Sequence, residues 1–128
     1  MELISYLDTH VTVWLHAGET VKLSNQAAQQ IEKSNLLISA MVMLEIEMLF
    51  EKGIVRYGSE QIYSDLHRAI GVNICQLPMD LIARSATTIK WTREPGDRLI
   101  TANAIANNYA PLVTKDVRIR EHYPQAIW

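Results

Sequence analysis

Short apolar segments alternate with helix-forming segments along the chain, and this alternation restricts the possible folds more than any other feature. The apolar segments cover residues 3–7, 36–38, 72–77, 111–113 and 126–128. The helix-forming segments cover residues 11–16, 24–33, 41–52, 59–69, 79–90 and 97–107. Strands that alternate with helices form a parallel sheet with helices on both faces. The sequence therefore predicts a three-layer α/β/α fold with a central, mainly parallel sheet of four to five strands.

The length of 128 residues suits one compact core, so we expect a single domain over residues 1–128. The one cysteine, Cys75, cannot form an internal disulfide and is expected to be a small buried hydrophobic residue in a reducing compartment. The longest apolar window, residues 36–50, contains two glutamates and is shorter than the roughly 20 residues that span a bilayer. There is no basic secretory signal. We therefore expect a cytoplasmic protein that does not enter a membrane.

Three aspartates are expected at one edge of the predicted sheet. Asp8 ends the first apolar segment, and Asp116 follows the fourth. Ligands of open α/β sheets bind outside the carboxyl ends of the strands, so both side chains are expected there. Asp97 stands at the start of a helix-forming segment and can face the same edge.

Two glutamates, Glu45 and Glu47, interrupt the most apolar helical segment. A fully buried carboxylate normally neutralises, pairs or binds a cation. At about 100° per residue, Glu45 has only apolar neighbours at i±3 and i±4, whereas the face of Glu47 leads to Glu51. We therefore expect Glu45 in the middle of the packed face, reaching the three aspartates, and Glu47 on a partly solvated face.

The aspartates also have a simpler explanation, because each stands just before a helix, where Asp is a common N-cap. Several carboxylates at one edge, in contrast, repel one another unless a cation is bound. Hard oxygen ligands without Cys or a His pair favour magnesium or manganese. The four histidines have no zinc-site spacing, and no glycine-rich phosphate loop is present. Ser39, which ends the second apolar segment, is expected to orient a carboxylate or to cap the next helix.

Several short motifs together resemble a known family. They are YLDTH at residues 6–10, WL at 14–15, ISA at 38–40 with Glu45 six residues after Ser39, EPGDRLITANA at 94–104 and LVTKD at 112–116. In this order they are similar to a PIN domain and, more narrowly, to a VapC-type toxin of a type II toxin–antitoxin system. Gly96 departs from the family pattern, in which an aromatic residue is common at this place.

The resemblance implies a Mg²⁺- or Mn²⁺-dependent endoribonuclease whose metal site consists of Asp8, Glu45, Asp97 and Asp116. It also implies a small antitoxin partner, an RNA substrate and a homodimer. Hydroxyl groups next to the acids are expected to orient the ligands or a water molecule. These hydroxyl groups belong to Thr9 and Thr114, with Ser39 as a further candidate.

The net charge of −2 argues against a broad basic surface for nucleic acid. Candidate contacts to RNA phosphates flank the acids, although a solvated surface explains each of them singly. They are Lys90, Arg93, Arg98 and Lys115.

Two other classes of protein share part of this pattern. A signalling receiver needs adjacent acids after its first strand, but here Thr9 follows Asp8. It also needs an aspartate after its third strand, where this chain has QLP at residues 76–78. A slow or silent PIN-like module that binds RNA or a protein without cleaving remains the alternative.

Overall fold

The computed structural model describes residues 3–128, so the first two residues of the expected domain lie outside it. Within these residues five strands form one sheet in the order β3-β2-β1-β4-β5, and all neighbouring strands are parallel. The elements in chain order are β1 (Ile4–Leu7), α1 (Thr9–Ala17), a 3-10 helix η1 (Thr20–Lys22), α2 (Asn25–Glu32), β2 (Asn35–Ile38), α3 (Ala40–Glu51), α4 (Ser59–Ile70), β3 (Asn73–Ile74), α5 (Met79–Ala86), α6 (Pro95–Ala106), β4 (Leu112–Val113), α7 (Val117–His122) and β5 (Ala126–Ile127). The predicted α/β fold with a parallel sheet is confirmed.

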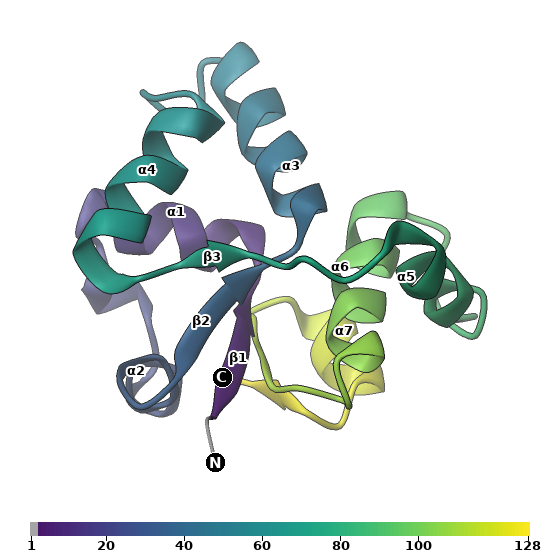
Figure 1. Cartoon of the computed structure of the whole chain (residues 1–128). Coiled ribbons are helices and arrows are strands. Elements are labelled where there is room, and N and C mark those ends of the chain that lie inside the picture. Colours follow the sequence, from purple (N-terminus) through teal and green to yellow (C-terminus); the bar gives the residue numbers. More distant parts are fainter. Residues whose placement is uncertain (1–2) are drawn as a thin grey trace.

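Helices lie on both sides of the sheet (Figure 1). On one side α1 packs against α4, and on the other side α5 and α6 form a closely packed pair. The helix α3 begins beyond the carboxyl end of β2 and contacts both α4 and α6. The helix that carries Glu45 therefore joins the two helical layers at the edge where the strands end.

The core lies between the sheet and these helices. The strands contribute Tyr6, Leu7, Ile38, Leu112 and Val113, all of which are fully buried. Burial of both faces of a strand is typical of parallel sheets. Within residues 3–128, no helix combines the length and the apolar character that crossing a membrane requires.

Two elements end three or more residues earlier than predicted. β3 ends at Ile74 and not at residue 77, because the Leu77 N–H donates to Cys75 Sγ at 3.4 Å and the chain turns away from the sheet. α5 ends at Ala86 and not at residue 90. Directly after this end, the hydroxyls of Thr87 and Thr88 donate to carbonyls of the last helical turn. Such side-chain bonds compete with helical hydrogen bonds.

Two helices begin earlier than predicted because acidic side chains cap them. α1 begins at Thr9, where Asp8 Oδ1 accepts the backbone N–H at 2.8 Å. α6 begins at Pro95, and the Glu94 carboxylate accepts the N–H groups of Gly96 and Asp97. Proline is favoured at the first position of a helix because its missing N–H would have no partner there.

Cys75 is not the simple buried hydrophobe that we expected. It is half-buried, and its sulfur accepts hydrogen bonds from Tyr6 Oη at 3.1 Å and from Asn103 Nδ2 at 2.9 Å. Asn107 Nδ2 also donates to Tyr6 Oη at 2.8 Å. A polar cluster therefore links β1, the end of β3 and α6.

Candidate active site

Asp8 and Asp116 follow neighbouring strands. Leu7 of β1 lies opposite Val113 of β4, and the Asp8 N–H extends this ladder by donating to Val113 O at 3.0 Å. Asp116 follows β4 and caps α7. Because parallel strands end at the same edge, the two aspartates meet although they are far apart in sequence.

One pocket of about 410 Å³ at this edge contains all four predicted acids. Its lining comes from α1 and its N-cap, from α3, from α6 and from the segment after β4. The lining residues are Asp8, Thr9, His10, Val11, Trp14, Glu45, Asp97, Lys115 and Asp116.

Two buried threonine hydroxyls orient the carboxylates. Thr114 Oγ1 donates to Asp8 Oδ2 at 2.5 Å, and Thr9 Oγ1 donates to Glu45 Oε1 at 2.5 Å. Thr114 Oγ1 also accepts the Asp116 N–H at 3.0 Å. These contacts restrict the rotamers of Asp8 and Glu45 and connect the ends of β1 and β4.

The N-cap explanation and the ligand explanation are compatible for two of the aspartates. Asp8 Oδ1 caps α1, and Asp116 Oδ1 caps α7 by accepting the Ile119 N–H at 2.9 Å. Asp116 keeps Oδ2 for the pocket, and Asp8 Oδ2, which accepts the Thr114 hydroxyl, has a second lone pair for a ligand. Asp97 is not an N-cap, because Glu94 occupies that position of α6.

Glu45 reaches the pocket from the side of α3 and not from the middle of its packed face, so that expectation is wrong. The fully buried residues of α3 are Val42 and Ile46, whereas Glu45 is half-buried and Leu44 is 54% exposed. The reason is that α3 stands at the end of the sheet, where only a narrow stripe of the helix is covered.

Gly96 of α6 provides the space for the Glu45 carboxylate. A Cβ atom added at Gly96 would lie 2.0 Å from Glu45 Oε2 and 2.9 Å from its carboxyl carbon. Gly96 stands where an aromatic residue is common in the family pattern. Because it has no side chain, α3 and α6 can approach each other with the Glu45 carboxylate between them.

Burial and mutual repulsion raise the pKa values of three of the acids. The pKa of Asp97 is raised to about 7, first by burial and then by the neighbouring carboxylates, of which Asp116 has the largest effect. Burial is also the main cause of the raised pKa values of Asp8 and Glu45, and the threonine hydroxyls oppose it. A bound divalent cation would offset both effects.

The residue types suit magnesium or manganese, since all four acids offer hard oxygen donors. As the side chains stand, no three His, Cys, Asp or Glu residues within residues 3–128 are arranged to hold a metal ion. Repulsion among carboxylates favours such separation when no cation neutralises them. The space at Gly96, into which the Glu45 carboxylate fits, shows that the fold accommodates a carboxylate pointed at this edge.

The predicted phosphate contacts are only partly gathered at the pocket. Lys115 lines it, whereas Lys90 and Arg93 are exposed and lie outside the lining. Arg98 Nε donates to Ala86 O at 3.0 Å, so this side chain closes the end of α5.

Ser39 and Glu47 both cap helices. Ser39 Oγ accepts the Met41 N–H at 3.1 Å at the start of α3. Glu47 was expected on a partly solvated face beside Glu51, and it is half-buried. Its Oε1 accepts both the N–H and the hydroxyl of Ser59 at 3.0 Å. The exposure of Glu47 agrees with a partly solvated face, whereas the contact by which this carboxylate ties α3 to the start of α4 was not predicted.

Sequence reasoning did not select His10 and Trp14 as site residues, although both line the pocket. Both lie on α1 after Asp8, and they are four residues apart, which places them on one face of the helix. This spacing after an acid at a strand end was the available signal.

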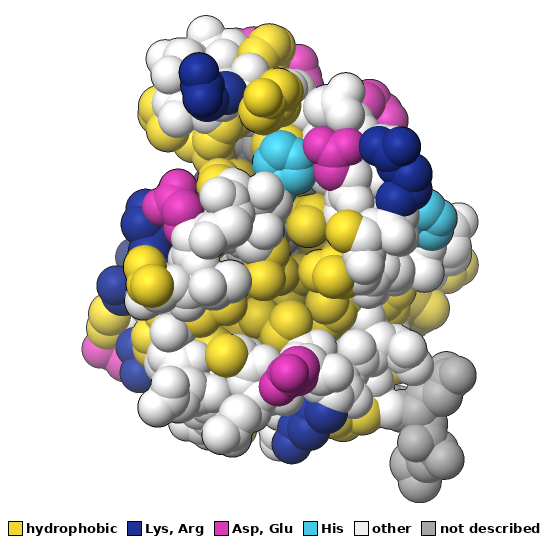
Figure 2. All heavy atoms as spheres, turned by 90° about the vertical axis from the view of Figure 1, so that its left-hand side faces the viewer, with side chains coloured by type: hydrophobic (Ala, Val, Ile, Leu, Met, Phe, Trp, Pro, Cys, Tyr) yellow, Lys and Arg dark blue, Asp and Glu magenta, His cyan; other side chains and the backbone are white. Residues whose placement is uncertain are grey.

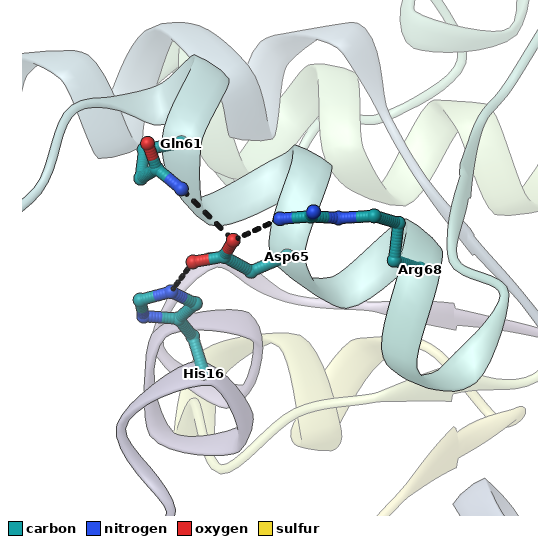
Figure 3. Close-up of polar contacts among 4 residues, drawn as sticks. All are labelled: His16, Gln61, Asp65 and Arg68. Atoms are coloured by element: carbon teal, nitrogen blue, oxygen red, sulfur yellow. Dashed lines mark hydrogen bonds and ion pairs between the residues drawn. The ribbon is translucent and has the colours of Figure 1, made fainter.

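A second cavity, of about 610 Å³, shares no lining residue with the first. It lies between α1, the α3–α4 loop and α4 and is lined by Val13, His16, Ala17, Glu19, Ile54, Val55, Arg56, Tyr57, Ile62 and Asp65. The Asp65 carboxylate lies 2.8 Å from His16 Nε2 and accepts hydrogen bonds from Gln61 and Arg68 (Figure 3). The bond with His16 is the main cause of the lowered pKa of Asp65. On the side of the molecule that carries α1 and α4, hydrophobic side chains gather in a hollow (Figure 2).

The sequence matches the PIN domain over residues 5–123, so the chain belongs to the PIN domain family, whose members are generally nucleases. The fold is similar to that of a chain in VapBC2 from Rickettsia felis bound to a DNA fragment from its promoter, with 18% identity, a TM-score of 0.67, and coverage of 97% of this chain and 96% of that chain. It is also similar to a chain in VapBC-1 from nontypeable Haemophilus influenzae, with 21% identity, a TM-score of 0.59, and coverage of 93% and 94%. No protein in the comparison with curated proteins matches the chain.

Proposed function

We propose that this chain is a Mg²⁺- or Mn²⁺-dependent endoribonuclease and the toxin of a type II toxin–antitoxin pair. The pocket shared by Asp8, Glu45, Asp97 and Asp116 carries the proposal. Three of these acids have raised pKa values caused by burial and by one another, which supports a site that takes up a cation. Membership of the PIN domain family supports a nuclease.

Asp8, Asp97 and Asp116 would hold the metal, and Glu45 would complete the site directly or through a bound water. A divalent ion in this place supplies a Lewis acid that makes bound water nucleophilic and stabilises the charge on the phosphate. The threonine hydroxyls keep two of the carboxylates aimed at the pocket. Lys115, which lines the pocket, would contact a phosphate of the RNA.

A small antitoxin is the proposed partner. The two similar structures are VapBC assemblies, and an unrestrained ribonuclease would harm its host. The second cavity combines the apolar side chains of Val13, Ile54 and Ile62 with the ionised Asp65. Such a surface fits an amphipathic segment whose apolar face fills the cavity. A basic side chain of the same segment would approach the four acids.

Manganese titration with RNA cleavage as the readout tests the enzymatic proposal. We expect cleavage that requires the metal, that Asp8→Asn abolishes, and that Asp80→Asn leaves unchanged. Asp80 is a matched control because it is an exposed acid on α5 that does not line the pocket. Binding of manganese and RNA without cleavage would instead support the module that binds and does not cleave.

Expression of the chain in a bacterial host tests the toxin proposal. The wild-type chain should slow growth, and Asp8→Asn should not. Equal growth of the two strains at equal protein levels would contradict a toxin. We also propose that the protein acts in the cytoplasm and forms a homodimer. The dimer is supported by apolar side chains on the surface of α3, since Leu44, Met48 and Phe50 are 54%, 39% and 41% exposed. Light scattering of the purified protein gives its mass.

A further inference from the structure

Two aromatic rings form one wall of the pocket that contains the four acids. Trp14 and His10 both line it, and their ring centroids are 6.1 Å apart with planes tilted by 48°. Trp14 is half-buried and His10 is exposed. Trp14 lies six residues beyond Asp8, which is about 9 Å along the axis of α1. This distance suits a nucleotide attached to a phosphate at the acids.

Trp14 is held in place by residues from other parts of the chain. The Trp128 ring lies 6.1 Å from it with a tilt of 55°, and Lys22 Nζ lies over the indole at 5.7 Å from the ring centroid. A cation over an indole face is attracted by the π system. Because these contacts already restrict the ring, little further freedom is lost when a ligand stacks on it.

The lining of this pocket offers little positive charge to a nucleic acid. The chain has a net charge of −2. Lys115 is the one lysine or arginine among the lining residues, which include four carboxylates. A divalent cation together with Lys115 does not exceed the charge of four ionised acids. Contacts that do not depend on charge add to affinity at such a pocket, and an aromatic wall supplies them.

We propose that Trp14, with His10 beside it, stacks an unpaired nucleobase next to the phosphodiester presented to the acids. This inference rests on the proposed ribonuclease activity and names a residue that positions the substrate of that activity. Bases inside a duplex already stack on one another and cannot offer a face to the protein. Every base has a π face, so this contact selects unpaired structure and not a particular base.

Tryptophan fluorescence gives a readout that is independent of cleavage. In the variant Trp91→Phe with Trp128→Phe, Trp14 is the one remaining tryptophan. The probe is a single-stranded DNA of eight thymidines, with Ca²⁺ present because it prefers oxygen ligands as Mg²⁺ does. We expect this strand to quench Trp14, whereas an abasic strand of equal charge and the same strand in a duplex should not. Equal quenching by the abasic strand, or none by any strand, would overturn the proposal.

Variants of the otherwise wild-type chain give a second test. Trp14→Leu should weaken binding of the thymidine strand by about 5- to 160-fold, the range for loss of one stacked base. Trp14→Phe should keep most of the affinity, since a smaller ring still stacks. Trp91→Leu is the matched control, because Trp91 stacks on His122 at 5.0 Å and does not line the pocket. If a melting experiment shows that Trp14→Leu is unfolded, the fluorescence experiment alone tests the stacking role of Trp14.

The two proposals fail in different ways. Cleavage of RNA by the wild type, combined with binding that does not depend on bases, overturns the stacking role alone. Stacking of the single-stranded probe without any cleavage by manganese-loaded wild type overturns the ribonuclease and leaves a pocket that binds single strands.

Discussion

Replacement of Gly96 by alanine tests the geometry of the candidate site most directly. The added methyl group would lie 2.0 Å from Glu45 Oε2 and 3.1 Å from Glu94 Oε2. Non-bonded atoms need a separation of about 3.5 Å or more, so the Glu45 carboxylate must move by roughly 1.5 Å. Glu45 is a flexible side chain, and it therefore moves more easily than the backbone of α6.

The expected effect on stability is small because opposing contributions nearly cancel. A displaced Glu45 loses the hydrogen bond from Thr9, and hydrogen bonds to charged groups contribute about 1.5–3 kcal/mol. Alanine is favoured over glycine inside a helix by about 1 kcal/mol. Moving Glu45 away from the other acids also relieves repulsion. We expect a change in the free energy of unfolding of about 1 kcal/mol or less without metal.

The effect on metal binding should be large, because Glu45 no longer points into the pocket. Loss of a residue that orients a metal ligand typically lowers affinity by about 10- to 100-fold, and Gly96→Ala should fall in this range. Calorimetry with Mn²⁺ measures the affinity, and melting in EDTA measures the stability. The double variant Gly96→Ala with Glu45→Gln should bind no more weakly than Glu45→Gln alone, because both changes act on one carboxylate. Wild-type Mn²⁺ affinity in Gly96→Ala would refute the reasoning.

Three further predictions follow from the contacts of the other acids. Glu45→Gln should reduce manganese binding and cleavage but raise the metal-free melting temperature, because it removes a carboxylate whose pKa is raised by burial; a lower melting temperature would contradict this. Glu47→Gln should keep cleavage and lose about 1 kcal/mol of stability in denaturant unfolding, because it weakens the cap on Ser59; unchanged stability would mean that the cap is unimportant. The pKa of Asp97 is about 7 in the folded chain and ordinary in the unfolded chain, so the folded state holds the proton more tightly. The metal-free free energy of unfolding should therefore decrease as the pH rises from about 4 to about 7. Melting in EDTA across this range should show a smaller fall in Asp97→Asn, and manganese affinity should rise with pH in the wild type because the proton must leave.

The order of strands and helices could be predicted from the sequence because it depends on local patterns. Apolar runs such as residues 3–7 are buried on both faces of the sheet, and helix formers between them leave few alternatives. Asp8 and Asp116 could be assigned to one edge because parallel strands end together. Element ends were less predictable. The end of β3 depends on a hydrogen bond between Leu77 and Cys75, which the pattern of apolar residues does not encode.

The two glutamates mark the limit of periodicity. A helical period shows that Glu45 and Glu47 point in different directions, but it does not show what each direction meets. In the folded chain Glu45 faces Gly96 of α6, and Glu47 faces Ser59 of α4. Both neighbours are known only once α3 is packed between two other helices, so the sequence did not predict the contact between Glu47 and Ser59.

The sequence by itself determined which residue types lie at the ends of the strands and that these types suit a hard divalent cation. Only the tertiary structure decided which carboxylate each threonine hydroxyl meets, Thr9 with Glu45 and Thr114 with Asp8. It also decided that the space at Gly96 and the ring of Trp14 lie beside the acids. The physical reason is the separation in sequence over which each interaction acts. Strand and helix signals arise from neighbours within a few residues, whereas hydrogen bonds, desolvation and repulsion among carboxylates depend on segments that meet only after the sheet has formed.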